Sequence, residues 1–179
     1  MRGAEAACDD DRPEFGIPGE RRVGGLVPAR PVSTGVKARA VLELHRNHGG
    51  QRAVALLGGE FVPGEGDRLA WQVGLGEPER FAPLPGLLPG ALQPGLPDWL
   101  GETPVTGLRP HLDGGALPAG RLVIDRAGYD RESSPLLFVT AARLLLHVLL
   151  ARACGAPAGP IIATWAESGR TPLELPGVG

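Results

Sequence analysis

The stretch RLVIDRAGYDRESSPLLFVTAARLLLHVLLARACGAPAGPIIATWA, residues 121–166, carries the clearest structural signal in this chain of 179 residues. Residues 121–125 form a short apolar run between two charged side chains, which is typical of a buried strand. A near-continuous apolar run follows over residues 136–153, and its length predicts a buried helix. Residues 159–166 form another short apolar run. The stretch therefore predicts strand, helix and strand, with a right-handed parallel crossover as the default connection.

The predicted helix has a clear start and a clear end. Ser134 is a typical N-cap residue, Pro135 suits the first helical position, and Gly155 and Pro157 stop the helix. The polar side chains before its last turn recur at spacings of three and four residues, which places them on one narrow stripe: Thr140, Arg143 and His147. Because the rest of the helix is apolar, we expect it to be mostly buried. A membrane span is disfavoured because the run is shorter than ~20 residues and carries a charge.

Upstream of this stretch, three shorter runs predict an antiparallel meander. Residues 36–44 (VKARAVLEL) alternate apolar and polar side chains, and the turn residues 47–50 (NHGG) follow them. Residues 52–57 and 69–75 are two further short apolar runs. A meander joined to a strand–helix–strand unit gives an α+β (mixed α/β) fold.

Proline and glycine divide the chain into segments. With 28 Gly and 19 Pro, the composition indicates an ordered domain that has long irregular parts. Residues 1–35 lack a sustained period, so we expect a flexible or loosely tied N-terminal arm, followed by a single α+β domain over residues 36–179. Residues 78–120 contain nine prolines and predict a long connection without a long helix or a central strand. Apolar side chains such as Leu92 and Trp99 indicate that this connection packs.

Charge and cysteine content argue against several classes of function. The chain has 18 Lys and Arg against 20 Asp and Glu, a net charge of -2, whereas a nucleic-acid groove normally needs a basic field. Cys8 and Cys154 lie far apart, and the histidines have no companion ligands at metal-binding spacing, so we expect neither a disulfide framework nor a metal. The N-terminal residues lack an apolar leader, which favours a cytoplasmic protein.

The loop between the predicted strand and the helix is the best candidate binding site. It brings two guanidinium groups, a glycine and two hydroxyl groups to the free amides of a helix start: Arg126, Gly128, Arg131, Ser133 and Ser134. Oriented N–H donors and the positive end of the helix dipole would hold a pyrophosphate or a carboxylate there. The alternative is an ordinary capped helix start in which the arginines pair with Asp125, Asp130 and Glu132.

Carboxylates are the candidate acids and bases. Asp98 and Glu102 flank Trp99 in the Pro-rich connection, and the environment of an aromatic ring can tune a carboxylate for general acid or base chemistry. Turn formation and solvation explain the same residues without catalysis.

From residue 121 to residue 177, the order of elements resembles the C-terminal half of the GNAT acyltransferase fold, nearest the autoinducer synthases that make N-acyl-homoserine lactones. The resemblance is carried by the strand with Arg121 and Asp125, by the long apolar helix, and by a closing segment that contains Pro172, Glu174 and Gly177. It implies an acyl donor, acyl-CoA or an acyl-carrier thioester, held where two parallel strands splay apart, with the anion loop on its phosphates.

The GNAT resemblance also implies a reaction. The acyl group would pass from the thioester to a small amine by direct attack, with Asp125 or Glu102 as the base. Arg126 and Arg131 would bind phosphate, and the two serines of the loop would complete the anion site.

A second resemblance favours another class of function. Residues 38–57 (ARAVLELHRNHGGQRAVALL) and residues 66–74 (GDRLAWQVG) are similar to the β-rich start of urease accessory proteins, which help deliver nickel. This resemblance implies a non-catalytic accessory or interaction protein. The Pro-rich connection and the apolar helix would then present surface to a protein partner.

Overall fold

A long β-hairpin lies near the middle of the sheet in the computed structural model, which describes residues 3–16, 19, 21–31 and 35–171. Its strands, β3 (Ala38–His48) and β4 (Gln51–Pro63), pair antiparallel over the whole of β3. Gly49 and Gly50 form the turn with φ of 59° and 83°, a backbone conformation that glycine adopts without the penalty of a Cβ atom. The first two strands of the predicted meander are therefore confirmed.

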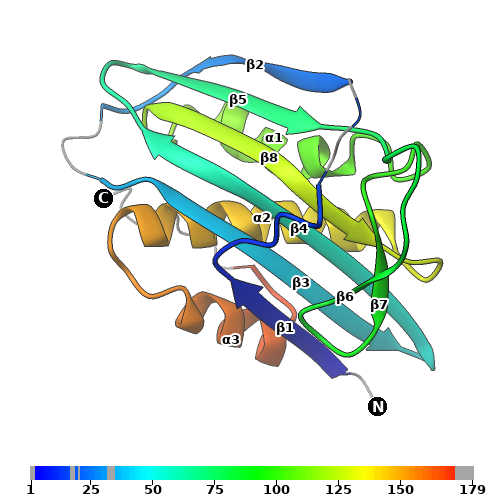
Figure 1. Ribbon diagram of the computed structural model, residues 1–179. Helices are drawn as coiled ribbons and strands as arrows, with labels where there is room; N and C mark the ends of the chain where they lie inside the picture. Colours follow the sequence, from blue (N-terminus) through cyan, green and yellow to red (C-terminus); the bar gives the residue numbers. More distant parts are fainter. Residues whose placement is uncertain (1–2, 17–18, 20, 32–34, 172–179) are drawn as a thin grey trace.

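The sheet is mixed and has the strand order β1-β3-β4-β8-β5-β2 (Figure 1). β8 (Gly120–Tyr129) runs between β4 and β5 (Arg68–Gly74), antiparallel to the former and parallel to the latter. β5, the third predicted strand, is thus separated from the hairpin by β8, whereas in a simple meander it would pair with β4. The two edge strands, β1 (Gly3–Asp9) and β2 (Arg22–Pro28), come from the region in which the sequence indicated a loosely tied arm.

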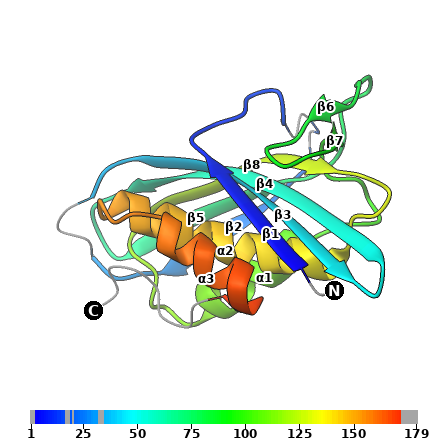
Figure 2. The same cartoon turned by 90° about the horizontal axis from the view of Figure 1, so that it is seen from below.

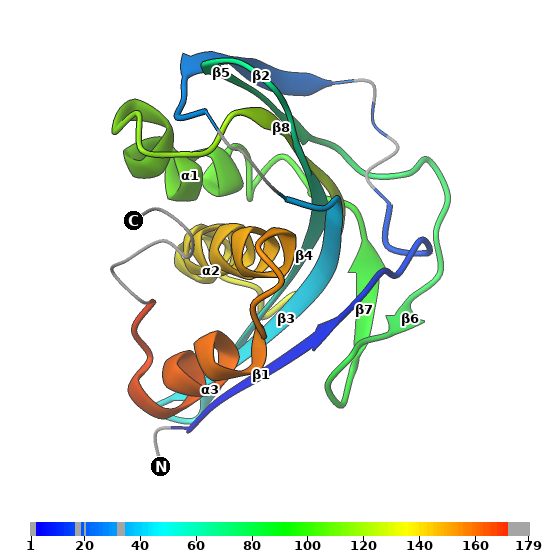
Figure 3. The ribbon, with the colours of Figure 1, turned by 90° about the vertical axis from the view of Figure 1, so that its left-hand side faces the viewer.

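Three helices cover one face of the curved sheet: α1 (Thr103–Asp113), α2 (Pro135–Ala153) and α3 (Gly159–Ser168) (Figure 2 and Figure 3). An α+β fold is therefore confirmed. α2 has Ser134 as its N-cap, as predicted, and its apolar side chains form the main core with the sheet. By length and composition α2 could cross a membrane, but most of it is buried in this core.

The polar stripe of α2 faces α1 over most of its length. Arg143 Nε donates to the carbonyl oxygen of Gly107 at 3.3 Å, and the ring of His147 meets the ring of His111 edge-on, with 5.6 Å between their centroids. The stripe therefore forms the interface between two helices, which explains how these side chains are accommodated beside a core.

The predicted last strand is wrong, because residues 159–168 form α3. Pro160 lies in the first turn, and Gly169 ends the helix with φ of 67°. Ile161, Ile162 and Trp165 lie on one helical face that packs against the core, where Trp165 is fully buried. A short apolar run fits one face of a helix as well as it fits a buried strand, and here the helix forms. The parallel pair of the sheet is instead β5 and β8.

The Pro-rich connection packs as expected, through side chains that are almost fully buried: Leu92, Leu96 and Leu100. Phe81 and Trp99 stay exposed. β6 (Leu84–Pro85) and β7 (Ala91–Pro94) belong to a strap, residues 84–94, on the sheet face opposite the helices. Beneath the strap lies a second, smaller core formed by Phe15, Val41, Val54, Leu56 and Leu92.

The connection also holds α1, a helix of eleven residues, where its prolines predicted no long helix. Pro104 lies in the first turn, where the helix needs no N–H from it, and Pro110 lies in the second half of the helix. Pro110 cannot donate the backbone hydrogen bond of an interior helical residue, so α1 forms in spite of it, with Val105, Leu108 and Leu112 packed in the main core.

Candidate functional site

A cleft of about 510 Å³ lies where the β3–β4 turn meets the start of α2. The strand ends beside the turn contribute Arg46 on β3 and Arg52 on β4, and the loop before α2 contributes Arg131, Glu132 and Ser134. The first turns of α2 add an apolar wall that includes Leu136. The volume falls within the ~300–1,000 Å³ of typical small-molecule sites.

Asp130 organises the loop before α2. Its Oδ1 accepts a hydrogen bond from the backbone N–H of Glu132 at 2.8 Å, and its own N–H donates to Ser133 Oγ at 3.0 Å. The backbone N–H of Ser133 donates to the carbonyl of Asp130 at 3.2 Å. The loop is therefore fixed by its own side chains immediately before the helix starts.

Arg52 ties this loop to the hairpin. Its guanidinium lies 3.2 Å from Asp130 Oδ2 and 3.4 Å from Glu132 Oε2, and it donates to the carbonyl of Pro89 at 3.2 Å. The charge of Arg52 is thus balanced inside the protein. Its role is to hold the walls of the cleft together.

Arg46 and Arg131 are the cations of the cleft that a ligand could use. Both are exposed, and within the described part of the chain neither forms an ion pair. Ser134 is the N-cap of α2, but its hydroxyl makes no capping hydrogen bond. Leu136 is 70% exposed beside them. The cleft therefore combines guanidinium groups, a hydroxyl group, a helix N-terminus and an apolar surface.

The structure brings only part of the predicted anion loop to this cleft. Arg131 and Ser134 line it, whereas Ser133 is buried and bonded to Asp130. Gly128 lies inside β8, where an added Cβ would be 3.0 Å from the ring of Phe15. Arg126 also belongs to β8, and its guanidinium pairs with Asp11 and Asp125. The predictions for Arg126, Gly128 and Ser133 as anion ligands are therefore not supported by their positions.

Arg126 lies away from the cleft because it is opposite Gly58, five residues along β4 from the cleft residue Ala53, and a β-bulge next to it sets the direction of its side chain. Gly58 pairs with Arg126 and Gly59 with Ile124, so Asp125 is an extra residue on β8. Such an extra residue changes the direction of the side chains beside it. Asp125 and Arg126 consequently join one ion-pair cluster with Arg39.

Neither predicted base lies at the cleft. Asp125 is beside Gly58, five residues along β4 from the cleft residue Ala53, which at ~3.3 Å per residue is ~17 Å. Glu102 is exposed at the start of α1. Asp98 pairs with Arg21 at 3.2 Å, and Trp99 lies edge-on to Tyr129 instead, with 6.1 Å between ring centroids.

The place where parallel strands separate is filled by the chain itself. β5 and β8 pair as far as Val73 and Ile124, and beyond this point β7 and the residues after it lie against β8. Gly95 N–H donates to Ala127 O at 2.8 Å, while Leu96 and Gly76 exchange two backbone hydrogen bonds of 2.7 and 3.0 Å. An acyl donor between these strands would have to displace those bonds. The remaining residues of the GNAT resemblance, Pro172, Glu174 and Gly177, lie outside the described residues.

Glu43 and His45 form a buried acid–base pair that no sequence pattern indicated. Glu43 is fully buried under the strap, where Oε1 lies 2.6 Å from His45 Nε2 and Oε2 accepts the backbone N–H groups of Leu87 and Leu88. The alternation of residues 36–44 placed Glu43 on the face away from the main core. Nothing in that alternation indicates that the distant strap covers this face.

Among the described residues, no group of three or more metal-binding side chains converges.

Comparison with known proteins adds no assignment, because no family model, no curated protein and no solved structure matches the chain significantly.

Proposed function

We propose that this protein binds an acyl thioester, acyl-CoA or an acyl-carrier thioester, in the cleft beside α2 and transfers its acyl group to a small amine. The observation that supports the proposal is the meeting of Arg131 and Ser134 with Arg46 and the exposed Leu136 in one cleft. Guanidinium groups at a helix N-terminus suit a phosphate. An adjoining apolar wall suits the uncharged part of the same ligand.

The reaction uses the only carboxylate that the cleft contributes from the described residues. The amine attacks the thioester carbonyl carbon, the C–N bond forms, the C–S bond breaks, and the leaving thiolate takes up, by way of Glu132, the proton that the amine loses. Glu132 is 48% exposed at the wall of the cleft and takes the proton that the amine loses. Glu132 therefore replaces Asp125 and Glu102 as the proposed base.

A thermal-shift series tests ligand binding. Coenzyme A, short and long acyl-CoAs, and pyrophosphate as a charge control are added to the purified chain. A ligand at ~100 times its Kd stabilises by ~2.7 kcal/mol, which should raise the melting temperature by roughly 5–11 °C. We expect acyl-CoA to give the larger shift, because it engages both the cationic and the apolar walls. Equal shifts with pyrophosphate would reduce the site to a general anion site.

Two double variants locate the binding. Arg46→Ala with Arg131→Ala should abolish the shift while the unliganded melting temperature changes little, because both side chains are exposed. Arg80→Ala with Arg109→Ala is the matched control, since these two exposed arginines lie outside the cleft. An acyl-CoA shift that survives in the first double variant contradicts the site.

A non-catalytic accessory or interaction protein is the second candidate. It is favoured by a specific observation: the predicted bases lie away from the cleft, and the space between the parallel strands is filled. Release of free thiol from acyl-CoA in the presence of amines separates the two candidates. Transfer activity that Glu132→Gln removes without removing the thermal shift supports the enzyme, and binding without any thiol release supports the accessory protein.

A further inference from the structure

β2 has an open edge. Among the described strands, none pairs with the side of β2 that faces away from β5. Leu75 N–H donates to Arg21 O at 3.0 Å, and Ala29 N–H donates to Asp67 O at 2.8 Å. Because bonded pairs alternate in an antiparallel ladder, the odd-numbered residues 21–29 direct their backbone groups to β5. The open edge therefore presents the N–H and C=O groups of Arg22, Gly24 and Leu26.

This edge has little of the usual protection against strand addition. Exposed edges are commonly blocked by charged side chains, above all lysine, by a bulge or by proline, and the one charged residue of β2 is Arg22 at its first position. β2 pairs with β5 in one unbroken register, and its only proline is its last residue, Pro28. Leu26 is 61% exposed, whereas Val23 and Val27 pack against the main core. An incoming strand would thus meet free backbone groups beside the edge of an apolar layer.

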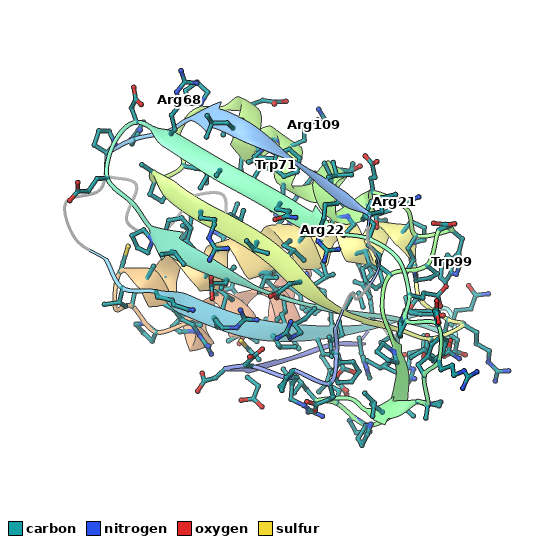
Figure 4. The ribbon with its side chains drawn as sticks, turned by 45° about the horizontal axis from the view of Figure 1, so that its top comes forward. Arg21, Arg22, Arg68, Trp71, Trp99 and Arg109 are labelled. Atoms are coloured by element: carbon teal, nitrogen blue, oxygen red, sulfur yellow. The ribbon has the colours of Figure 1, made fainter. Side chains whose placement is uncertain are left out.

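The charge around the edge is positive. Residues 21–31 contain three arginines and no acidic residue. Because the whole chain has a net charge of -2, all other residues together carry a net charge of -2 - 3 = -5. Arg68 on β5, opposite Pro28, and Arg109 on α1 lie along the same β2 side of the sheet (Figure 4). Arg21 and Arg68 pair with the exposed Asp98 and Asp67, but across the described ranges Arg22 and Arg109 form no ion pair.

We propose that β2 binds an extended acidic segment of a partner protein as an additional strand. Backbone groups of the segment pair with Arg22, Gly24 and Leu26. Every second side chain is apolar and extends the layer of Val23 and Val27, and the others are carboxylates that face the arginines. Pairing of β2 with β2 of a second copy is disfavoured, because it brings like charges together along the edge. The edge is independent of the cleft, to which neither β2 nor β5 contributes.

The test is an NMR titration of the full chain with a heptapeptide of alternating glutamate and valine, Glu-Val-Glu-Val-Glu-Val-Glu. The amides of Arg22, Gly24 and Leu26 should shift, and their hydrogen exchange should slow by about tenfold or more, because they become bonded to the peptide. The amides of Val23 and Gly25 should change little, since they face β5. Uniform small shifts, or shifts centred on another surface, would overturn the proposal.

Two controls separate strand addition from simple charge attraction. Leu26→Pro removes one outward N–H without touching the β5 ladder and should weaken peptide binding at least about tenfold, whereas Leu26→Thr keeps that N–H and should retain binding. The same heptapeptide with lysine in place of glutamate should bind at least about tenfold more weakly. If Leu26→Pro does not fold, the glutamate peptide with alternate N-methyl amides provides the same test on the wild-type chain and should not bind.

Three outcomes contradict the proposal. Equal binding by the N-methylated peptide would show that no strand is added. Equal binding of the lysine peptide would show that the edge does not select an acidic partner. Protection of the edge amides by oligo-dT, or by concentration-dependent self-association, without an effect of the glutamate peptide would assign the edge to nucleic acid or to a second copy.

Discussion

Arg39 and Asp125 form an ion pair on the face of the sheet opposite the helices, with Arg39 Nη2 at 3.0 and 3.3 Å from the two carboxylate oxygens of Asp125. The same guanidinium lies 3.2 Å from Glu60, whose side chain is only 6% exposed, and 3.3 Å from Asp11. Asp125 is thus one partner in a cluster that joins β3, β4, β8 and the segment after β1. Its position argues for a structural role.

Removal of Arg39 should destabilise the fold. Arg39→Met leaves the carboxylates of Glu60 and Asp125 close together without their shared partner, and we expect a loss of ~1–3 kcal/mol of unfolding free energy. Chemical denaturation measures this loss. Arg68→Met is the control, because that arginine and its partner Asp67 are both mostly exposed and such pairs are worth ~0–1 kcal/mol. Equal losses in the two variants would contradict the structural role of the cluster.

Glu60 should make the fold sensitive to acid. The hydrogen bond from Lys37 and that from Arg39 lower the pKa of Glu60 from its ordinary value of 4.5, against the opposing effect of burial. A carboxylate with a lowered pKa in the folded state stabilises the fold above pH 4.5, and this contribution is lost as the pH falls below that value. Wild-type stability should therefore drop more steeply than that of Glu60→Gln between about pH 5 and pH 3. Parallel slopes in denaturation series would contradict this assignment.

Part of the fold and of the cleft could be predicted from local sequence alone. Ser134 and Pro135 specify a helix start by themselves, so the start of α2 and the place of Arg131 and Ser134 beside it follow from the sequence. Arg46 and Arg52 reach the same site only because a long hairpin brings the β3–β4 turn to α2. No pattern within either segment indicates that meeting.

Three features of the fold that differ from the sequence prediction have identifiable physical causes. β8 continues to Tyr129, so Arg126 and Gly128 belong to the strand and not to the loop to which the sequence assigned them. β1 and β2 have little periodicity of their own and are ordered by pairing with β3 and β5. The apolar run of α3 is too short to distinguish a strand from a helix, and packing on one face decides between them.

The contact between α1 and α2 should weaken below neutral pH. Burial lowers the pKa of His111 from its ordinary value of 6.5, and the nearby charge of Arg143 acts in the same direction. A histidine with a lowered pKa in the folded state stabilises the fold above pH 6.5, and this contribution is lost as the pH falls below that value. Wild-type stability should fall between pH 7.5 and about pH 5.5 by more than that of His111→Gln. Urea denaturation at both pH values measures the difference, and identical decreases would contradict it.

Gly107 should be essential to the same contact. A Cβ atom at this position would collide with the carbonyl oxygen of Val139 and lie 3.0 Å from the Cβ of Ala142. Gly107→Ala should cost ~1–3 kcal/mol, because the backbones of α1 and α2 must move apart. Gly159→Ala is the matched control, since nothing lies within 4 Å of a Cβ there and its effect should be neutral to stabilising by ~1 kcal/mol. A neutral Gly107→Ala in thermal denaturation would show that the two helices are not packed this closely.

Glu43 should hold the strap against the sheet. Its buried carboxylate accepts the N–H groups of Leu87 and Leu88, and an added Cβ at Gly86 would be 2.6 Å from Oε2, so the strap passes directly over it. Glu43→Ala leaves the N–H donors of the half-buried Leu87 and Leu88, and the buried His45, without their acceptor, and a loss of ~2–4 kcal/mol is expected. Hydrogen exchange should accelerate at Leu87 and Leu88 well before it changes in β3 and β4, because the strap can open while the sheet persists. Glu5→Ala is the control, since Glu5 is opposite His45 in the β1–β3 register but is exposed. If exchange in the strap is as slow in Glu43→Ala as in Glu5→Ala, the second core alone holds the strap and the carboxylate is not its anchor.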